Sequence, residues 1–405
     1  MKNIYKYASL LLAAAIAFSC QPPVDGQEPE ENGGNNGGGS LEKKTLTITS
    51  DRNLIQTFDG DCANLTVALN GEILTEGVTF YRDFDKKSEV LSDVTSPVKV
   101  EGSKLYADTE GEYVIWANYG TYISDKVTIK ATDVEIPSTP VDPAPESTDF
   151  KARVLLTEFT TVGCTACPGM KAILHTLEQD QKMIDKYVLV ECHSGLINSV
   201  PDPCFLYNNT FESWCQITGF PTVKINLVNT LIDRTEIKSV INEYVEAQEE
   251  VAPGIAVNAT LKNDKVVAKV TVKAKVDGNY RVGAFLLEDG VYATQLGSNV
   301  EEYMNTHNNV IRYVDAQYKN NFYGYPVTDI QAGKAADAMF SWNLDDIWTY
   351  GSDKGEIHGG QAWPERDNSR LEMAVFVSAS DGAGGYQVLN SIICPINGET
   401  PYQYK

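Results

Sequence analysis

The sequence is poor in basic residues: 33 Lys and Arg stand against 55 Asp and Glu, and the formal net charge at pH 7 is -22. Binding of nucleic acid needs clustered Lys and Arg that neutralise phosphates and release counterions. An acidic surface repels a phosphate backbone instead. We therefore exclude nucleic acid as a partner and interpret the acidic charge as a source of solubility.

The sequence also lacks a hydrophobic run of about twenty residues, the length that a membrane-spanning helix requires. The apolar run Leu10–Phe18 is too short to span and follows two lysines, which is typical of a secretory signal peptide over residues 1–19. Ser19-Cys20 resembles the lipobox, the cleavage site of bacterial lipoproteins, although Ala17 replaces the usual Leu. This resemblance implies acylation of Cys20 and anchoring to a lipid bilayer. Ordinary secretion, with Cys20 merely near the cut, is the alternative.

The cysteines do not divide into pairs. The chain has 8 of them, and once Cys20 is assigned to the anchor and Cys164 and Cys167 to a local pair, an odd number remains. At least one thiol must therefore be free among Cys62, Cys192, Cys204, Cys215 and Cys394. On one continuous helix Cys204 and Cys215 would be about 16 Å apart, so a disulfide between them requires a break in that helix. Pairing of either with Cys192 is an alternative.

Changes in composition divide the N-terminal part of the chain. Residues 20–42 are rich in Gly, Asn, Glu and Pro with almost nothing apolar, which predicts a flexible tether. Residues 43–132 contain short alternating strands between turn residues, and this spacing predicts an immunoglobulin-like β-sandwich that acts as a spacer or binding module. The prolines of residues 133–150 predict a semi-rigid linker.

The pattern changes again at residues 151–250, where the strand RVLLTEF, the helical run PGMKAILHTLEQDQKMIDKY and the buried strand YVLVEC follow one another. This order predicts an α/β domain with a parallel strand pair. Further helices are expected at about Phe205–Cys215 and near Glu236–Glu249. Alternating strands return in residues 251–405 and predict a C-terminal β-sandwich, with a long irregular insertion between about Ser298 and Arg370.

The segment TEFTTVGCTACPGMK places Cys164 between a strand and a helix, with Cys167 one helical turn later. Free N–H groups and the positive dipole end of a helix stabilise a thiolate there, so we predict that Cys164 is the more exposed and more acidic thiol. Cys167 is then the resolving thiol. Glu158, on the preceding strand, is placed to exchange a proton with Cys167. Pro221 opens a later strand, where a cis proline would lie beside the cysteines.

Three motifs in this order, Glu158-Phe159, Cys164-x-x-Cys167 and Phe220-Pro221-Thr222, resemble the thioredoxin-like superfamily over about residues 151–249. The resemblance implies that Cys164 attacks, Cys167 resolves, Glu158 relays a proton, and Phe220 with Pro221 forms the substrate-facing loop.

The chain also departs from the thioredoxin pattern. Gly163 stands in place of the usual Trp, Thr165-Ala166 replaces Gly-Pro, and extra residues fall around Ser194–Cys204. Redox potential and partner preference therefore do not carry over from the resemblance.

The whole arrangement is similar to the twenty-eight-kilodalton outer-membrane protein family, Gram-negative lipoproteins with a thioredoxin-like region followed by a β-sandwich. The similarity spans about residues 151–400 and implies a lipid-anchored protein of the outer membrane, on either its periplasmic or its surface face. The residues that carry it are His193-Ser194-Gly195, Asp202-Pro203, GAFLLEDGV and His307-Asn308-Asn309-Val310.

These patterns predict a thiol-disulfide oxidoreductase that acts on thiols or disulfides of exported proteins without a cofactor. The alternative is a surface binding or adhesion lipoprotein in which the cysteine pair is structural or vestigial. Solvent-accessible sulfurs beside a cis Pro221 would favour catalysis. Sulfurs buried under the following β-sandwich would favour a structural disulfide.

A metal site at the cysteine pair is a third hypothesis. Cys164 and Cys167 with one of His193, Cys192 or Cys204 as a further ligand supply too few donors for a closed zinc site. Copper-binding proteins of this fold use a wider cysteine spacing followed by a later His, which the chain lacks. We therefore predict no metal.

Overall fold

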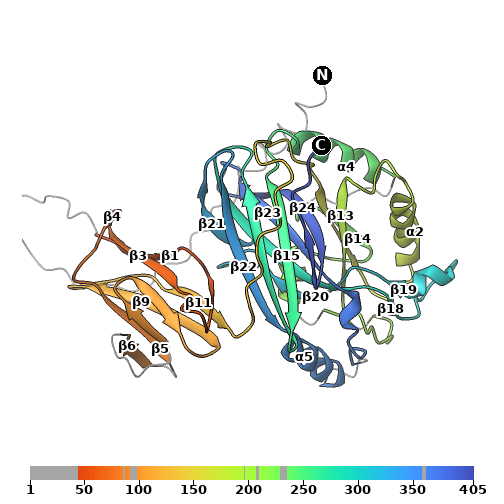
Figure 1. Cartoon of the computed structure of the whole chain (residues 1–405). Helices are drawn as coiled ribbons and strands as arrows, with labels where there is room; N and C mark the ends of the chain where they lie inside the picture. Colours follow the sequence, from red (N-terminus) through yellow and green to blue (C-terminus); the bar gives the residue numbers. More distant parts are fainter. Residues whose placement is uncertain are drawn as a thin grey trace, which may run out of the picture. The chain divides into compact units, whose positions relative to one another are not determined.

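The computed structural model describes residues 44–84, 87–91, 98–195, 197–206, 209–228, 235–357 and 362–405. The predicted signal peptide over residues 1–19, the lipidation site Cys20 and the tether over residues 20–42 lie outside these residues. The described chain is mostly β-sheet with few helices (Figure 1). None of the helices in the described ranges is long and apolar enough to span a membrane.

The described residues between 46 and 132 form two sheets, in which most strand pairs are antiparallel, and the two sheets enclose one core. The strands are β1 (Leu46–Ser50), β2 (Leu54–Gln56), β3 (Ala63–Leu69), β4 (Glu72–Ile73), β5 (Thr79–Phe84), β6 (Lys87–Val90), β7 (Val98–Glu101), β8 (Lys104–Ala107), β9 (Gly111–Tyr119), β10 (Tyr122–Ile123) and β11 (Val127–Thr132). One sheet has the order β1-β3-β8-β7 and the other β2-β11-β9-β5-β6. Alternate residues of β3 and β9 are buried in the same cluster, which is the layering of a β-sandwich.

The rest of the chain contains the helices α2 (Cys167–Glu178), α3 (Asn209–Trp214), α4 (Ile237–Gln248) and α5 (Leu344–Ile357) and the short 3-10 turns η1 (Glu302–Asn305) and η2 (Asn368–Arg370). Its strands are β12 (Val154–Thr160), β13 (Tyr187–His193), β14 (Thr222–Ile225), β15 (Gly254–Lys262), β16 (Lys265–Lys273), β17 (Gly278–Glu288), β18 (Val291–Tyr292), β19 (Thr306–His307), β20 (Val310–Asp315), β21 (Tyr325–Ile330), β22 (Ala335–Asn343), β23 (Leu371–Ser380), β24 (Tyr386–Pro395) and β25 (Gly398–Thr400).

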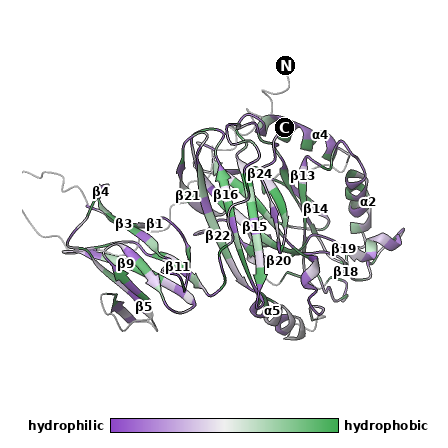
Figure 2. Ribbon diagram, in the orientation of Figure 1, coloured by the Kyte–Doolittle hydropathy of each residue, from purple (hydrophilic) through white to green (hydrophobic). Residues whose placement is uncertain are grey.

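The predicted strand, helix, strand unit is present. β12 and β13 pair in parallel and α2 connects them, while β14 pairs with the other edge of β12 in the antiparallel direction. Pro168 lies in the first turn of α2, where its missing N–H costs no hydrogen bond, and Met170, Leu174 and Leu177 repeat at helical spacing on the buried face. These residues pack with α4 on one face of β12. Figure 2 shows this as hydrophobic strands covered by helices of mixed hydropathy.

The sheet continues beyond β13 in the order β14-β12-β13-β20-β17-β23-β24. β13 pairs in parallel with β20 at Glu191 and Val310, so strands from both sides of residue 250 share one sheet. The face of β12 that points away from α2 also shares a core with this later part, because Leu155 and Phe159 pack in one cluster with Phe285 and Phe376. A second sheet, β22-β16-β15-β25, encloses a further core with β17 and β23.

Two expectations are wrong. The stretch Ser298–Arg370 is not an irregular insertion, since it contains β20, β21, β22 and α5, and β20 joins the two parts of the long sheet. β20 is short and buried on both faces, so its sequence VIRYVD shows no alternation that would mark it as a strand. The helix expected over Phe205–Cys215 is shorter, because α3 covers only Asn209–Trp214 and leaves Cys204 before it.

Candidate functional site

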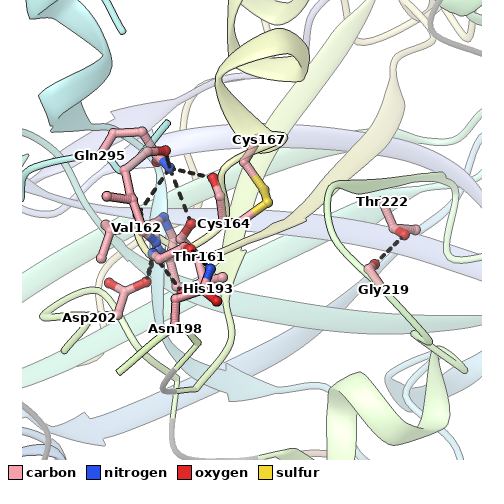
Figure 3. The surroundings of a disulfide bond; sticks show 12 residues. Thr161, Val162, Cys164, Cys167, His193, Asn198, Asp202, Gly219, Thr222 and Gln295 are labelled. Carbon is pink, nitrogen blue, oxygen red and sulfur yellow. Dashed lines mark hydrogen bonds and ion pairs between the residues drawn. A yellow bond between two sulfur atoms is a disulfide. The ribbon is translucent and has the colours of Figure 1, made fainter. Parts of the chain in front are cut away.

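A disulfide joins Cys164 and Cys167 at the point where β12 gives way to α2 (Figure 3). β12 ends at Thr160, a turn comes next, and Cys167 is the first residue of α2. The backbone N–H of Cys164 donates to the carbonyl of Thr161 at 3.0 Å. The pair thus lies at the N-terminal end of a helix, where the free N–H groups favour a thiolate when the bond is reduced.

Both cysteines are largely buried, and Cys164 is the more exposed of the two, as predicted: the exposed fractions are 6% for Cys164 and 1% for Cys167. The peptide bond between Phe220 and Pro221 is cis, also as predicted. Phe220 and Pro221 are half-buried, and Thr222 donates its hydroxyl to the carbonyl of Gly219 at 2.7 Å, which closes their turn. The cis Pro221 favours catalysis by the cysteine pair. The burial of both sulfurs favours a structural disulfide instead.

Gln295, from the loop after β18, holds the segment that carries the cysteines. Its Nε2 lies 3.0 Å from the carbonyl oxygen of Cys164, 3.1 Å from that of Val162 and 3.4 Å from that of Thr161 (Figure 3). The N–H of Leu296 donates to the carbonyl of Val162 at 2.8 Å. No sequence pattern points to Gln295, because it is more than a hundred residues from the cysteines and belongs to no motif.

A steric constraint explains why residue 163 is a glycine. A Cβ at this position would lie 2.2 Å from the carbonyl oxygen of Ile197, which no side chain can accommodate without a backbone shift. Asn198 donates from its side-chain amide to the carbonyl of Gly163 at 2.8 Å. The extra residues around Ser194–Cys204 therefore occupy the space beside the cysteine loop, which explains why a Trp does not fit before Cys164.

Glu158 is 1% exposed, and neither oxygen of its carboxyl group has a hydrogen-bond partner among the residues that the structure describes. Burial, together with the nearby Glu191 carboxylate, raises the pKa of Glu158 to about 8. The carboxyl group therefore holds its proton at neutral pH. It lies on β12, directly opposite Glu191 of β13 in the register of the two strands.

A buried polar cluster, composed of Lys171, Glu191, His193, Asp202 and His307, lies between α2 and the sheet. Asp202 accepts from the Nδ1 of His193 at 2.8 Å and from the N–H of Val162 at 2.9 Å, so it connects the cluster to the cysteine loop (Figure 3). Glu191 lies 3.3 Å from the Nε2 of His193 and 3.5 Å from the Nδ1 of His307.

Charges alternate within the polar cluster. Burial lowers the pKa of His193, but the Asp202 carboxylate outweighs burial and raises it to about 9. Burial raises the pKa of Glu191, but the Lys171 ammonium and the protonated His193 hold it well below its usual range. Burial lowers the pKa of His307, which accepts from the Lys171 ammonium at 2.9 Å as a neutral ring.

The other described cysteines are free thiols: Cys62, Cys192, Cys204, Cys215 and Cys394. Burial raises the pKa of Cys192, Cys204 and Cys215 above the ordinary thiol value, so these groups stay protonated. Cys204 precedes α3 and forms no disulfide with Cys215.

Similar solved structures include HBP35 of Porphyromonas gingivalis, which is 14% identical over 63% of this chain and 78% of its own, with a TM-score of 0.45. A protein of Agrobacterium tumefaciens is 12% identical over 63% of this chain and 98% of its own, with a TM-score of 0.37. TM-scores this low do not establish a common fold.

No curated protein sequence matches the chain. Residues 208–350, which run from just before α3 to the middle of α5, match the model of a protein family described as "Outer membrane protein Omp28". Over these residues, about a third of the chain, the protein is similar to the Omp28 outer-membrane proteins.

Proposed function

We propose that this protein is a lipoprotein of the outer membrane, anchored through Cys20, whose Cys164 and Cys167 exchange disulfides with thiols of exported proteins. The observation that carries the proposal is the position of the disulfide: it comes after β12, begins α2, and shares its domain with a cis Pro221 before β14. These positions support our interpretation of the region as thioredoxin-like.

The exchange needs no cofactor. A thiolate of a partner dithiol attacks the Sγ of Cys164, the Cys164–Cys167 bond breaks, and Cys167 leaves with the electron pair and takes a proton. The second thiolate of the partner then attacks the partner's own sulfur in the mixed disulfide, and Cys164 leaves as a thiolate. The partner dithiol becomes a disulfide and the protein disulfide becomes a dithiol, so electrons and protons balance. The reverse sequence reduces a partner disulfide.

Three further residues have roles in this scheme. Glu158 is the proton relay for Cys167, since it lies on the strand that leads to the pair and is a protonated carboxyl group with no hydrogen-bond partner in the described part of the chain. Phe220 and Pro221 form the loop that receives the partner chain. Attack falls on Cys164 because Cys167 is the more deeply buried of the two.

Insulin reduction driven by excess dithiol tests the proposal. The wild type should accelerate reduction and Cys164→Ser should not, while Cys394→Ser, which removes a buried thiol elsewhere in the chain, should match the wild type. A Cys167→Ser variant lacks the thiol that resolves the mixed disulfide. Exported partner proteins should therefore stay bound to its Cys164 through a disulfide and be released by reductant.

The burial of both sulfurs favours a second candidate, a surface binding or adhesion lipoprotein with a structural disulfide. This function would replace the first if wild type and Cys164→Ser proved equally inactive in insulin reduction while both remained folded. The anchor is tested separately: Cys20→Ala should abolish incorporation of labelled palmitate, and retained incorporation would refute the lipoprotein assignment.

A further inference from the structure

The polar cluster beneath α2 has an additional member with no role in the proposed exchange. The thiol of Cys204 and ring nitrogens of His193 and His307 all lie within 4.8 Å of one another. All three residues are fully or almost fully buried. Two imidazoles and a thiol are the donors that zinc prefers. Cys164 and Cys167 are not part of this group, since their sulfurs are bonded to each other.

The carboxylate of Glu191 lies beside the two histidines of this group. Its Oε2 lies 3.3 Å from the Nε2 of His193 and 3.5 Å from the Nδ1 of His307. Donors that surround zinc tetrahedrally at about 2.0 Å are separated from each other by about 3.3 Å. The spacing therefore suits a common ion with little movement of these three side chains.

The second ring nitrogen of each histidine also has a hydrogen-bond partner, which fixes the orientation of the ring. The Nδ1 of His193 contacts Asp202 at 2.8 Å, and the Nε2 of His307 contacts the carbonyl oxygen of Ala293 at 3.3 Å. Histidines that bind metals usually donate their second ring N–H to a carboxylate or a backbone carbonyl, which fixes the ring and its tautomer. In both histidines the nitrogen that faces Glu191 would bind the ion, and His193 and the Cys204 thiol would each release a proton as the metal binds.

A cation already lies at this position. The ammonium group of Lys171 is 2.9 Å from the Nδ1 of His307 and 3.8 Å from Glu191. The Lys171 side chain is 13% exposed, whereas both histidines are buried. The lysine is therefore the member of the cluster whose side chain is able to turn toward solvent. The metal-free protein thus neutralises Glu191 with an ammonium that a divalent ion is able to replace.

We propose that Glu191, His193, Cys204 and His307 form a zinc site, with the Lys171 ammonium as its competitor in the metal-free protein. Four protein donors leave no open coordination position, so the ion is structural. It would connect β13, the segment after it and β19, and through His193 and Asp202 it would support the loop that carries Cys164. The proposal does not depend on disulfide exchange, since the two sites share no donor.

Equilibrium dialysis of the full-length chain against Zn²⁺ is the test, with the Cys164–Cys167 disulfide kept oxidised so that its sulfurs cannot bind. The wild type should bind one ion per chain. Cys204→Ser and His307→Asn should bind at least about tenfold more weakly, as expected when part of a coordination shell is lost. Cys394→Ser is the matched control, because it removes a buried thiol outside the cluster, and it should bind like the wild type.

Two further measurements apply even if those variants fail to fold. Co²⁺ added to the wild type should give a thiolate-to-cobalt charge-transfer band. Lys171→Met should bind Zn²⁺ more tightly than the wild type, whereas a polar cluster with a merely structural role would lose stability and gain no affinity. Absence of Zn²⁺ binding in both the wild type and Lys171→Met, or binding that Cys204→Ser leaves unchanged, overturns the site.

Discussion

Glu158 contributes to stability in a way that depends on pH. Its pKa is about 8 in the folded chain against 4.5 for an ordinary glutamate, so the folded state holds the proton more tightly between these values. The stabilising contribution is complete below about pH 4.5 and is lost as the pH rises through 8. Each pKa unit corresponds to about 1.4 kcal/mol, which makes the loss on the order of a few kcal/mol.

Glu158→Gln should remove this dependence, since an amide has no proton to lose. Urea unfolding at pH 5 and at pH 9 measures it: the free energy of unfolding of the wild type should fall relative to that of the variant as the pH rises. The exposed Glu146→Gln is the control and should behave like the wild type. A difference between wild type and Glu158→Gln that stays constant with pH would contradict the assignment of a neutral, buried carboxyl group.

Gly163 is a second position where one residue determines the site. Gly163→Ala should destabilise the protein by about 1–3 kcal/mol, the usual cost of forcing an extra carbon into a packed region, because the new methyl group meets the Ile197 carbonyl oxygen at 2.2 Å. Gly219→Ala, in the turn before Pro221, has no atom within 4 Å of the new carbon and should be close to neutral. Equal destabilisation of the two variants in thermal unfolding would refute the steric explanation.

At the scale of elements, we expect the loop between β18 and η1 to limit access to the disulfide, because it is hydrogen-bonded to the segment that carries Cys164. Gln295→Ala removes the amide that contacts the carbonyl oxygens of Cys164 and Val162, at a cost of about 1 kcal/mol for each hydrogen bond lost. The disulfide should then be reduced several times faster by a phosphine, as measured by alkylation and mass spectrometry. Gln331→Ala, at an exposed position, is the control. An unchanged rate in Gln295→Ala would mean that this loop does not limit access.

The elements nearest the cysteines could be predicted from sequence because their signals are local. The sequences of β12, α2 and β13 each contain apolar residues at the spacing of a buried strand or helix. Glu158, Cys164, Cys167 and Pro221 belong to the three motifs that resemble the thioredoxin-like superfamily. Gln295, Lys171 and His307 could not be placed, because their contacts depend on how β19 and β20 return to β13 from far along the chain. β20 itself could not be predicted, since a strand buried on both faces has no alternation to recognise.

At the scale of the whole molecule, the long sheet makes residues 151–250 dependent on residues 251–405. Phe285 and Phe376 share a core with Leu155 and Phe159, and burial of one such side chain is worth about 1.5–3 kcal/mol. A fragment of residues 151–250 should therefore lack a cooperative unfolding transition, whereas residues 151–405 should show one. Circular dichroism during urea titration distinguishes them. Cooperative unfolding of the short fragment would show that the shared core is dispensable.

The dependence of the cysteine loop on Gln295 has a consequence for how the protein is made. Cys167 leaves the ribosome about 130 residues before Gln295, and at roughly 5–20 residues per second the two are about 6–25 seconds apart in synthesis. A chain delivered to an oxidising compartment with its N-terminus first would present both thiols before the segment that binds the cysteine loop has arrived. We therefore expect an oxidant to reach this pair on the incomplete chain, before Gln295 binds the cysteine segment.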